Sequence, residues 1–262
     1  MIDVHTHLLP GVDDGARTIE QSLEVLRRFA AEGVRCVVCT PHLAASEAHV
    51  MPPDRYRERH WRLGELAPEG LVIQRGWEIM LDRPGVDLTA PSLALGASHA
   101  VLVEFPRGTL PSGTTDELAR LRRSGIVPVV AHPERYGRMT VALVREWRAV
   151  GAVMQTDTAY LLGGGERAAL ARELLGSGLI DILASDNHGD TRSLPAARTW
   201  LEEIGAVDQA RLLTEINPGA LLSDQILVPV PPVRIDEGTF GRLRQLVKRL
   251  TPLGSPSIPE RP

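Results

Sequence analysis

Ile2-Asp3-Val4-His5-Thr6-His7 opens the chain with a short apolar run that leads into two histidines. The run predicts a β-strand over 2–4, and six further apolar, β-branched runs follow it along the chain. They predict strands over 34–39, 71–74, 100–103, 126–131, 153–156 and 180–184. Helical patterns separate these runs, and strands that alternate with helices are typical of a parallel sheet.

The helical patterns mark the connections between the strands. The clearest begins at Thr18, where Gln21 three residues later completes a capping-box pattern, and it ends before Gly33. The other predicted helices cover 55–66, 115–123, 141–150, 166–175, 194–204, 209–216 and 237–250. We expect Asn217-Pro218 to end the helix over 209–216. Seven strands in 262 residues favour an α/β barrel over an open, doubly wound sheet.

The proline content changes near the C-terminus and indicates how the chain is divided. We expect one barrel domain over residues 1–228. A C-terminal helical extension, 229–250, should pack on this barrel. Residues 251–262 are rich in proline and serine, which predicts a disordered tail.

Composition excludes several classes of function. The formal net charge is −4, so the chain lacks the basic excess of a nucleic-acid-binding surface. No window approaches eighteen uninterrupted apolar residues, which argues against a membrane span. The first residues lack the basic region and apolar core of a secretory signal, so we expect a cytoplasmic protein.

Metal-ligand side chains follow six of the seven predicted strands. They are His5 and His7, His42, Glu78, Glu104, His132, and the pair Asp186 and His188. These positions lie at the C-terminal ends of the strands, where barrel enzymes build their active sites. The loop after the first strand adds Asp13 and Asp14, and the spacing alone does not choose between these two aspartates.

Electrostatics suggests why such residues would gather. Buried carboxylates that are crowded together repel one another and take up protons unless cations neutralise them. Two or three divalent ions would supply this charge, with neutral imidazoles completing the coordination. Nitrogen and oxygen ligands without thiolate suit manganese, iron or zinc.

Two arginines lie close to these residues in the sequence. Arg135 follows His132 by three residues, and Arg192 follows His188 by four. An arginine beside a metal cluster can bind phosphate oxygens through two parallel hydrogen bonds. The alternative is an ion pair with a neighbouring acid such as Glu134 or Asp190.

The chain resembles the polymerase-and-histidinol-phosphatase (PHP) family, and more closely the bacterial protein-tyrosine phosphatases of capsule and exopolysaccharide biosynthesis. The resemblance covers roughly residues 1–225. It rests on the segments 3–15 (DVHTHLLPGVDDG), 40–42 (TPH), 104–106 (EFP), 132–136 (HPERY) and 185–188 (SDNH), and on Glu78 and Asn217-Pro218.

This resemblance implies a distorted, TIM-like barrel of seven strands with three metals, usually manganese. The family pattern assigns His5, His7, Glu78 and Asp186 to one metal. It assigns Glu78, Glu104 and His132 to a second metal. It assigns Asp14, His42 and His188 to the third metal, and so selects Asp14 over Asp13. The family also implies roles for Arg135 and for an arginine after the last ligand pair; Arg192 is one residue nearer His188 than the family pattern.

The predicted function is phosphomonoester hydrolysis by metal-activated water. The resemblance implies a protein-tyrosine phosphatase that acts on the phosphotyrosine of a bacterial tyrosine kinase in polysaccharide biosynthesis. Cys36 and Cys39 lack the Cys-x5-Arg loop of the cysteine-nucleophile phosphatases. Two alternatives remain: a small-molecule phosphatase of the same family, such as one acting on histidinol phosphate, and a non-catalytic metal-binding regulatory module.

Overall fold

The computed structural model describes residues 1–50, 54–108 and 110–235. In these ranges the strands form two parallel sheets, ordered β1-β2-β4 and β3-β5-β6-β7-β8-β9. Their bounds are β1 (Ile2–Thr6), β2 (Cys36–Cys39), β3 (His42–Ala44), β4 (Val72–Arg75), β5 (Glu78–Met80), β6 (Ala100–Glu104), β7 (Val127–Ala131), β8 (Val153–Asp157) and β9 (Ile182–Ala184). Wholly parallel pairing confirms the predicted α/β class.

The two sheets form one continuous, curved layer of strands, the barrel wall, because β2 leads directly into β3 and β4 leads directly into β5. Thr40-Pro41 interrupts the first pair and Gly76-Trp77 interrupts the second. Hydrogen bonds from Gly76 N to Cys39 O (2.9 Å) and from Glu78 N to Pro41 O (3.1 Å) continue the pairing across the break. Pro41 has no N–H to donate, which accounts for an interruption there. Counted as interrupted strands, the two pairs give the seven strands predicted from the sequence.

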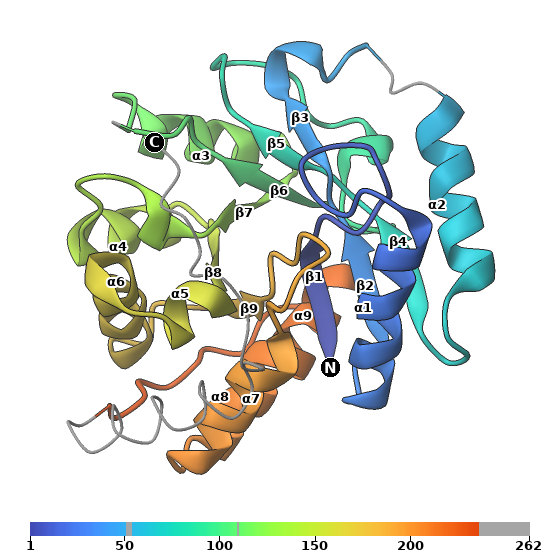
Figure 1. The fold of residues 1–262 in the computed structure, drawn as a ribbon. Helices are drawn as coiled ribbons and strands as arrows, with labels where there is room; N and C mark the ends of the chain where they lie inside the picture. Colours follow the sequence, from blue (N-terminus) through green and yellow to red (C-terminus); the bar gives the residue numbers. More distant parts are fainter. Residues whose placement is uncertain (51–53, 109, 236–262) are drawn as a thin grey trace.

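The wall curves round until β1 meets the end of β9 (Figure 1). An isolated parallel bridge joins Thr6 to Asn187. Asp186 N donates to His5 O at 3.0 Å, and His7 N donates to Asn187 O at 2.8 Å. The buried carboxylate of Asp3 accepts a hydrogen bond from Ser185 N at 3.1 Å. This seam is short, and the residues that form it include predicted metal ligands.

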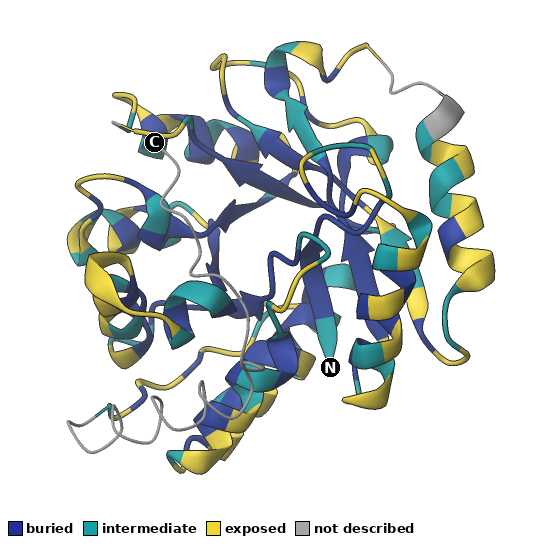
Figure 2. Cartoon of the chain, viewed as in Figure 1, coloured by how far each residue is buried: buried dark blue, intermediate teal, exposed yellow. Residues whose placement is uncertain are grey.

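Helices cover the outside of the strands (Figure 1). They are α1 (Ile19–Ala31), α2 (Asp54–Leu66), α3 (Thr114–Arg123), α4 (Val141–Ala149), α5 (Thr158–Leu162), α6 (Gly165–Gly176), α7 (Leu194–Glu203), α8 (Val207–Arg211) and α9 (Asn217–Leu222). Strands are mostly buried, whereas helices expose their outer faces (Figure 2). At α1, Thr18 accepts from Gln21 N as predicted, but the Gln21 side chain accepts from Arg17 N and not from the cap residue.

The prediction that Asn217-Pro218 ends a helix was wrong. After α8, residues Leu212–Ile216 form a π-helical turn, and α9 continues through Pro218 to Leu222. A proline ring clashes with the carbonyl four residues earlier in a regular α-helix, and a π turn relieves that clash. The buried Asn217 amide also donates to Asp181 O and accepts from Val228 N, which ties this helix to β9 and to the C-terminal segment.

The C-terminal segment leaves α9 and packs back on the barrel. Val230 and Val233 are buried in the main apolar core, and Val233 N donates to Leu175 O of α6. The predicted helix over 237–250 and the predicted tail over 251–262 lie outside the described residues. Within the described ranges, no helix combines the length and the apolar character needed to cross a membrane.

Candidate metal centre

The predicted ligands converge at one rim of the barrel. His42 and Glu78 were predicted to end strands, but they are the first residues of β3 and β5, after the breaks in the two interrupted strands. All nine of them fall into, or directly beside, three overlapping groups of histidine and carboxylate side chains. Two of the predicted ligands, His132 and Asp186, adopt left-handed backbone conformations with φ of 36° and 48°. Such a conformation is costly for residues other than glycine and is characteristic of functional sites. Here it turns the side chain of each residue as its strand ends.

The inner cluster consists of His5, His7, Glu78 and Asp186, all of them buried. The His5 and His7 Nε2 atoms lie 3.2 Å apart. Each Nε2 also lies 3.2–3.3 Å from Glu78 Oε2 and from Asp186 Oδ1. Neither of these two oxygens has a hydrogen-bond partner in the described part of the chain. Buried oxygens and imidazole nitrogens that face one another in this way suit a cation.

The Glu78–Glu104 cluster consists of His42, Glu78 and Glu104. His42 Nδ1 lies 3.0 Å from Glu78 Oε2 and 3.6 Å from Glu104 Oε1. His132, the histidine predicted for this position, also lies beside it: its Nε2 is 2.6 Å from Glu78 Oε1 and 3.9 Å from Glu104 Oε2. Burial and the neighbouring charge of Glu78 raise the pKa of Glu104 to about 7. The carboxylates of Glu78 and Glu104 therefore repel each other in the absence of a cation.

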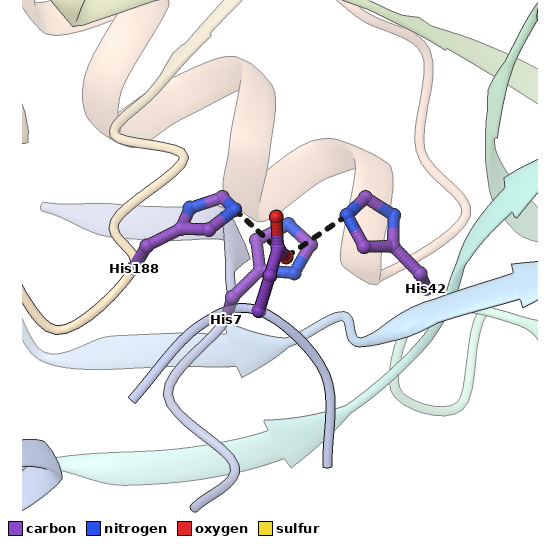
Figure 3. A group of neighbouring side chains, drawn as sticks. His7, His42 and His188 are labelled. Carbon is purple, nitrogen blue, oxygen red and sulfur yellow. Dashed lines mark ion pairs between the residues drawn. The ribbon is translucent and has the colours of Figure 1, made fainter. Parts of the chain in front are cut away.

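The outer cluster consists of His7, Asp14, His42 and His188 (Figure 3). Asp14 Oδ1 lies 3.3 Å from His42 Nε2 and 3.4 Å from His188 Nε2. Asp13 instead places Oδ2 2.6 Å from His7 Nδ1, on the opposite side of that imidazole from the inner cluster. The structure therefore separates the two aspartates that spacing left open: Asp14 faces His42 and His188 of the outer cluster, whereas Asp13 contacts His7 Nδ1.

The carboxylates of the site shift the pKa of His5 and of His42 upward, whereas burial and Arg135 lower the pKa of His132 to about 4. Burial disfavours a charged imidazole, but the carboxylates of Glu78 and Asp186 outweigh it and raise the pKa of His5 to about 9. Burial also opposes the charge on His42, yet Asp14 and Glu78 raise its pKa to about 10. The neighbouring carboxylates therefore favour the protonated form of both imidazoles in the metal-free protein. A divalent ion would take the place of these protons.

Both predicted arginines reach the site and meet at one carboxylate. Arg192 Nη1 lies 3.0 Å from Asp186 Oδ2, and Arg135 Nη1 lies 3.7 Å from the same oxygen. Arg192 also makes the predicted alternative contact, because Nε and Nη2 both lie 2.8 Å from Asp190 Oδ2. Arg192 thus reaches the site although it lies one residue nearer His188 in the sequence than the family pattern has it.

Sequence reasoning missed the polar residues at the end of β8. Gln155 and Asp157 are buried beside the inner cluster, and Gln155 contacts His5. The 153–156 run was predicted only as a strand, although Gln155 is a polar residue within it and Asp157 follows it directly, as the predicted ligands follow other strands. Glu134 was considered only as an ion-pair partner, and it instead accepts a hydrogen bond from Asp157 N.

The protein is a parallel α/β barrel with histidines and carboxylates gathered at one rim. This combination is characteristic of barrel metalloenzymes. Comparison with known proteins narrows this class. The family model "Capsular polysaccharide synthesis, CpsB/CapC" matches residues 1–223. The chain therefore belongs to the CpsB/CapC family, which agrees with the resemblance drawn from its motifs.

Similar proteins match along most of the chain. Tyrosine-protein phosphatase YwqE of Bacillus subtilis (strain 168) is 31% identical over 244 residues, which cover 88% of this chain and 95% of that protein. Tyrosine-protein phosphatase CpsB of Streptococcus pneumoniae is 28% identical over 244 residues, covering 87% and 100%. A crystal structure from work on YwqE and CpsB as "unique metal-dependent tyrosine phosphatases" matches with a TM-score of 0.76 and 28% identity, covering 90% of this chain and all of that one.

Proposed function

We propose that this chain is a metal-dependent protein-tyrosine phosphatase. One observation carries the proposal: three groups of metal-ligand side chains share His7, His42 and Glu78, and two arginines meet at their edge. Close-set cations beside guanidinium groups suit the hydrolysis of a phosphate ester. The similar proteins YwqE and CpsB are named as tyrosine phosphatases, which favours phosphotyrosine among the possible esters.

We propose three divalent ions, with manganese as the activating metal and iron or zinc as alternatives. The donor set fits such ions, because imidazole nitrogens and carboxylate oxygens lie together without a thiolate. When bound, the ions would activate water as the nucleophile and neutralise phosphate charge. By this proposal His5, His7, Glu78 and Asp186 hold one ion. Glu78, Glu104 and His132, with His42 alongside, hold the second, and Asp14, His42 and His188 hold the third.

The arginines would stabilise the phosphoryl group during its transfer. Arg135 and Arg192 would bind the equatorial oxygens of the phosphoryl group as charge redistributes in the transition state. A tyrosine leaving group has a pKa near 10, so it needs less acid assistance than an alkyl alcohol. Cys39 offers no alternative nucleophile, because burial raises the pKa of its thiol to about 12.

The substrate class follows from the proposed activity and the family. A phosphatase of capsular polysaccharide synthesis would act on a phosphotyrosine protein, and we propose a bacterial tyrosine kinase as that protein. The ligands lie at the C-terminal rim of the barrel, and His42 and His188 are only partly buried. A side chain presented by another protein could therefore approach the outer cluster.

A substrate panel tests the activity. With Mn²⁺ present, we expect kcat/KM for a phosphotyrosine peptide to exceed the values for histidinol phosphate and for a nucleotide diester. A higher kcat/KM for histidinol phosphate would instead identify a small-molecule phosphatase of the same fold, and would overturn the assignment to protein phosphotyrosine.

Chelation separates an enzyme from a non-catalytic metal-binding module. We expect p-nitrophenyl phosphate turnover to be lost after chelation and to return when Mn²⁺ is added back. Equal rates before and after chelation, or no turnover with manganese, iron or zinc, would contradict the enzymatic assignment.

A further inference from the structure

The end of β8 holds a hydrogen-bonded chain that leads to the inner cluster. His5 Nδ1 lies 2.9 Å from Gln155 Oε1. Gln155 Nε2 in turn donates to Asp157 Oδ1 at 3.0 Å. His5 and Gln155 are fully buried and Asp157 is 1% exposed, so water does not compete for these contacts.

The order of these contacts fixes the orientation of the amide and of the imidazole. Gln155 directs the NH₂ end of its amide at Asp157 Oδ1, which accepts from it. The carbonyl end of the amide must then face His5, and a carbonyl only accepts. His5 Nδ1 therefore donates, which leaves Nε2, 3.3 Å from both Glu78 Oε2 and Asp186 Oδ1, as the nitrogen that faces the metal position.

We propose that Gln155 is a positioning residue for the inner cluster, which presents His5 to a metal ion in the Nε2-ligand tautomer. The proposal rests on the metal binding described under the proposed function. Ligating histidines generally donate their second N–H to an acceptor that fixes the ring and raises the basicity of the other nitrogen. Gln155 supplies that acceptor, and Asp157 keeps its amide from rotating.

The backbone around the chain is held as well. Glu134, in the turn after β7, accepts from Asp157 N at 2.9 Å through Oε1 and from the Thr156 hydroxyl at 3.2 Å through Oε2. These contacts attach the end of β8 to the segment that follows His132. The strand without a predicted ligand thus supports the ligands on either side of it.

The second histidine of the inner cluster has a different partner. His7 Nδ1 lies 2.6 Å from the Asp13 carboxylate, whereas His5 faces a neutral amide. A carboxylate raises the basicity of an imidazole more than an amide does. Gln155 therefore orients His5 without adding a further negative charge to a site already crowded with carboxylates.

The test is Mn²⁺ affinity, measured by titration of metal-free protein, together with the number of ions bound. Gln155→Met keeps the length of the side chain but removes the acceptor, and we expect binding at one site to weaken by about 10- to 100-fold. The double variant Gln155→Glu/Asp157→Asn keeps an acceptor for His5 and the total charge, because the new asparagine can donate to the new glutamate, and it should bind close to wild type. Gln74→Met on β4 is the matched control and should leave affinity unchanged, because Gln74 lies outside all three clusters.

The outcomes separate this proposal from the proposed function. Wild-type protein that binds no Mn²⁺ would overturn both. Wild-type binding with Gln155→Met equally tight, or with Gln155→Glu/Asp157→Asn as weak as Gln155→Met, would overturn only the role of Gln155. If Gln155→Met does not fold, Asp157→Ala gives the same test by freeing the amide: weaker binding supports the proposal and unchanged binding contradicts it.

Discussion

Replacement of Glu78 by glutamine is expected to lower kcat by on the order of 10³-fold or more, the largest loss of any single ligand substitution. Glu78 is shared by the inner cluster and the Glu78–Glu104 cluster. Its two oxygens lie within 3.3 Å of four imidazoles, those of His5, His7, His42 and His132. Glutamine has nearly the same shape but carries no charge, so both clusters that share Glu78 lose a negatively charged ligand at once.

The measurement is p-nitrophenyl phosphate turnover at saturating Mn²⁺, with metal content determined on the same samples. Glu117→Gln is the matched control, because Glu117 is also mostly buried but pairs with Arg120 on α3, away from the clusters. Its turnover should match wild type. A Glu78→Gln enzyme that retained activity within tenfold of wild type, fully loaded with metal, would show that this carboxylate does not bridge two ions.

Arg135→Ala should cause the second large loss, about 10²- to 10³-fold in kcat. Arg135 is mostly buried. Among the described residues its one ion pair is the 3.7 Å contact with Asp186 Oδ2, so its guanidinium can turn to a phosphate without breaking a short ion pair. Arg135→Lys should not restore the rate, because a single ammonium cannot reproduce two parallel hydrogen bonds.

Arg192 provides the internal comparison. Two of its nitrogens are already bound to Asp190, so Arg192→Ala should cost less than Arg135→Ala. Arg145→Ala, an exposed change on α4, should leave the rate unchanged. Steady-state kinetics on a phosphotyrosine peptide separate these variants. Full activity of Arg135→Ala would remove this arginine from the proposed mechanism.

Most of the site could be predicted because parallel strands deliver their C-terminal ends to one rim. A polar residue at or directly after the end of such a strand is brought there by topology alone, as Glu104 at the end of β6 and His132 after β7 show. What spacing could not predict was orientation. Asp13 and Asp14 are adjacent in one loop, and only their contacts with His7 and His42 separate a supporting residue from a ligand candidate.

The remaining misses have specific causes. Gln155 is neither a charged side chain nor an imidazole, so a search for metal ligands does not select it, although it contacts His5. The pair Asn217-Pro218 is a strong stop signal for an α-helix, but a π turn before it admits the proline. In both cases tertiary contacts of a buried amide, invisible in a local sequence pattern, decide the outcome.

We propose that bound cations stabilise the convergence of these acids and imidazoles, because they offset the repulsion between the buried carboxylates. Calorimetric titration of metal-free protein with Mn²⁺, in buffers of different ionisation enthalpy, tests it directly. The raised pKa values of His5, about 9, and His42, about 10, mean that binding must displace protons at neutral pH. We predict binding with proton release, and an apparent affinity that falls as the pH is lowered. Folded protein that binds no Mn²⁺, or binds it without releasing protons, would contradict the claim.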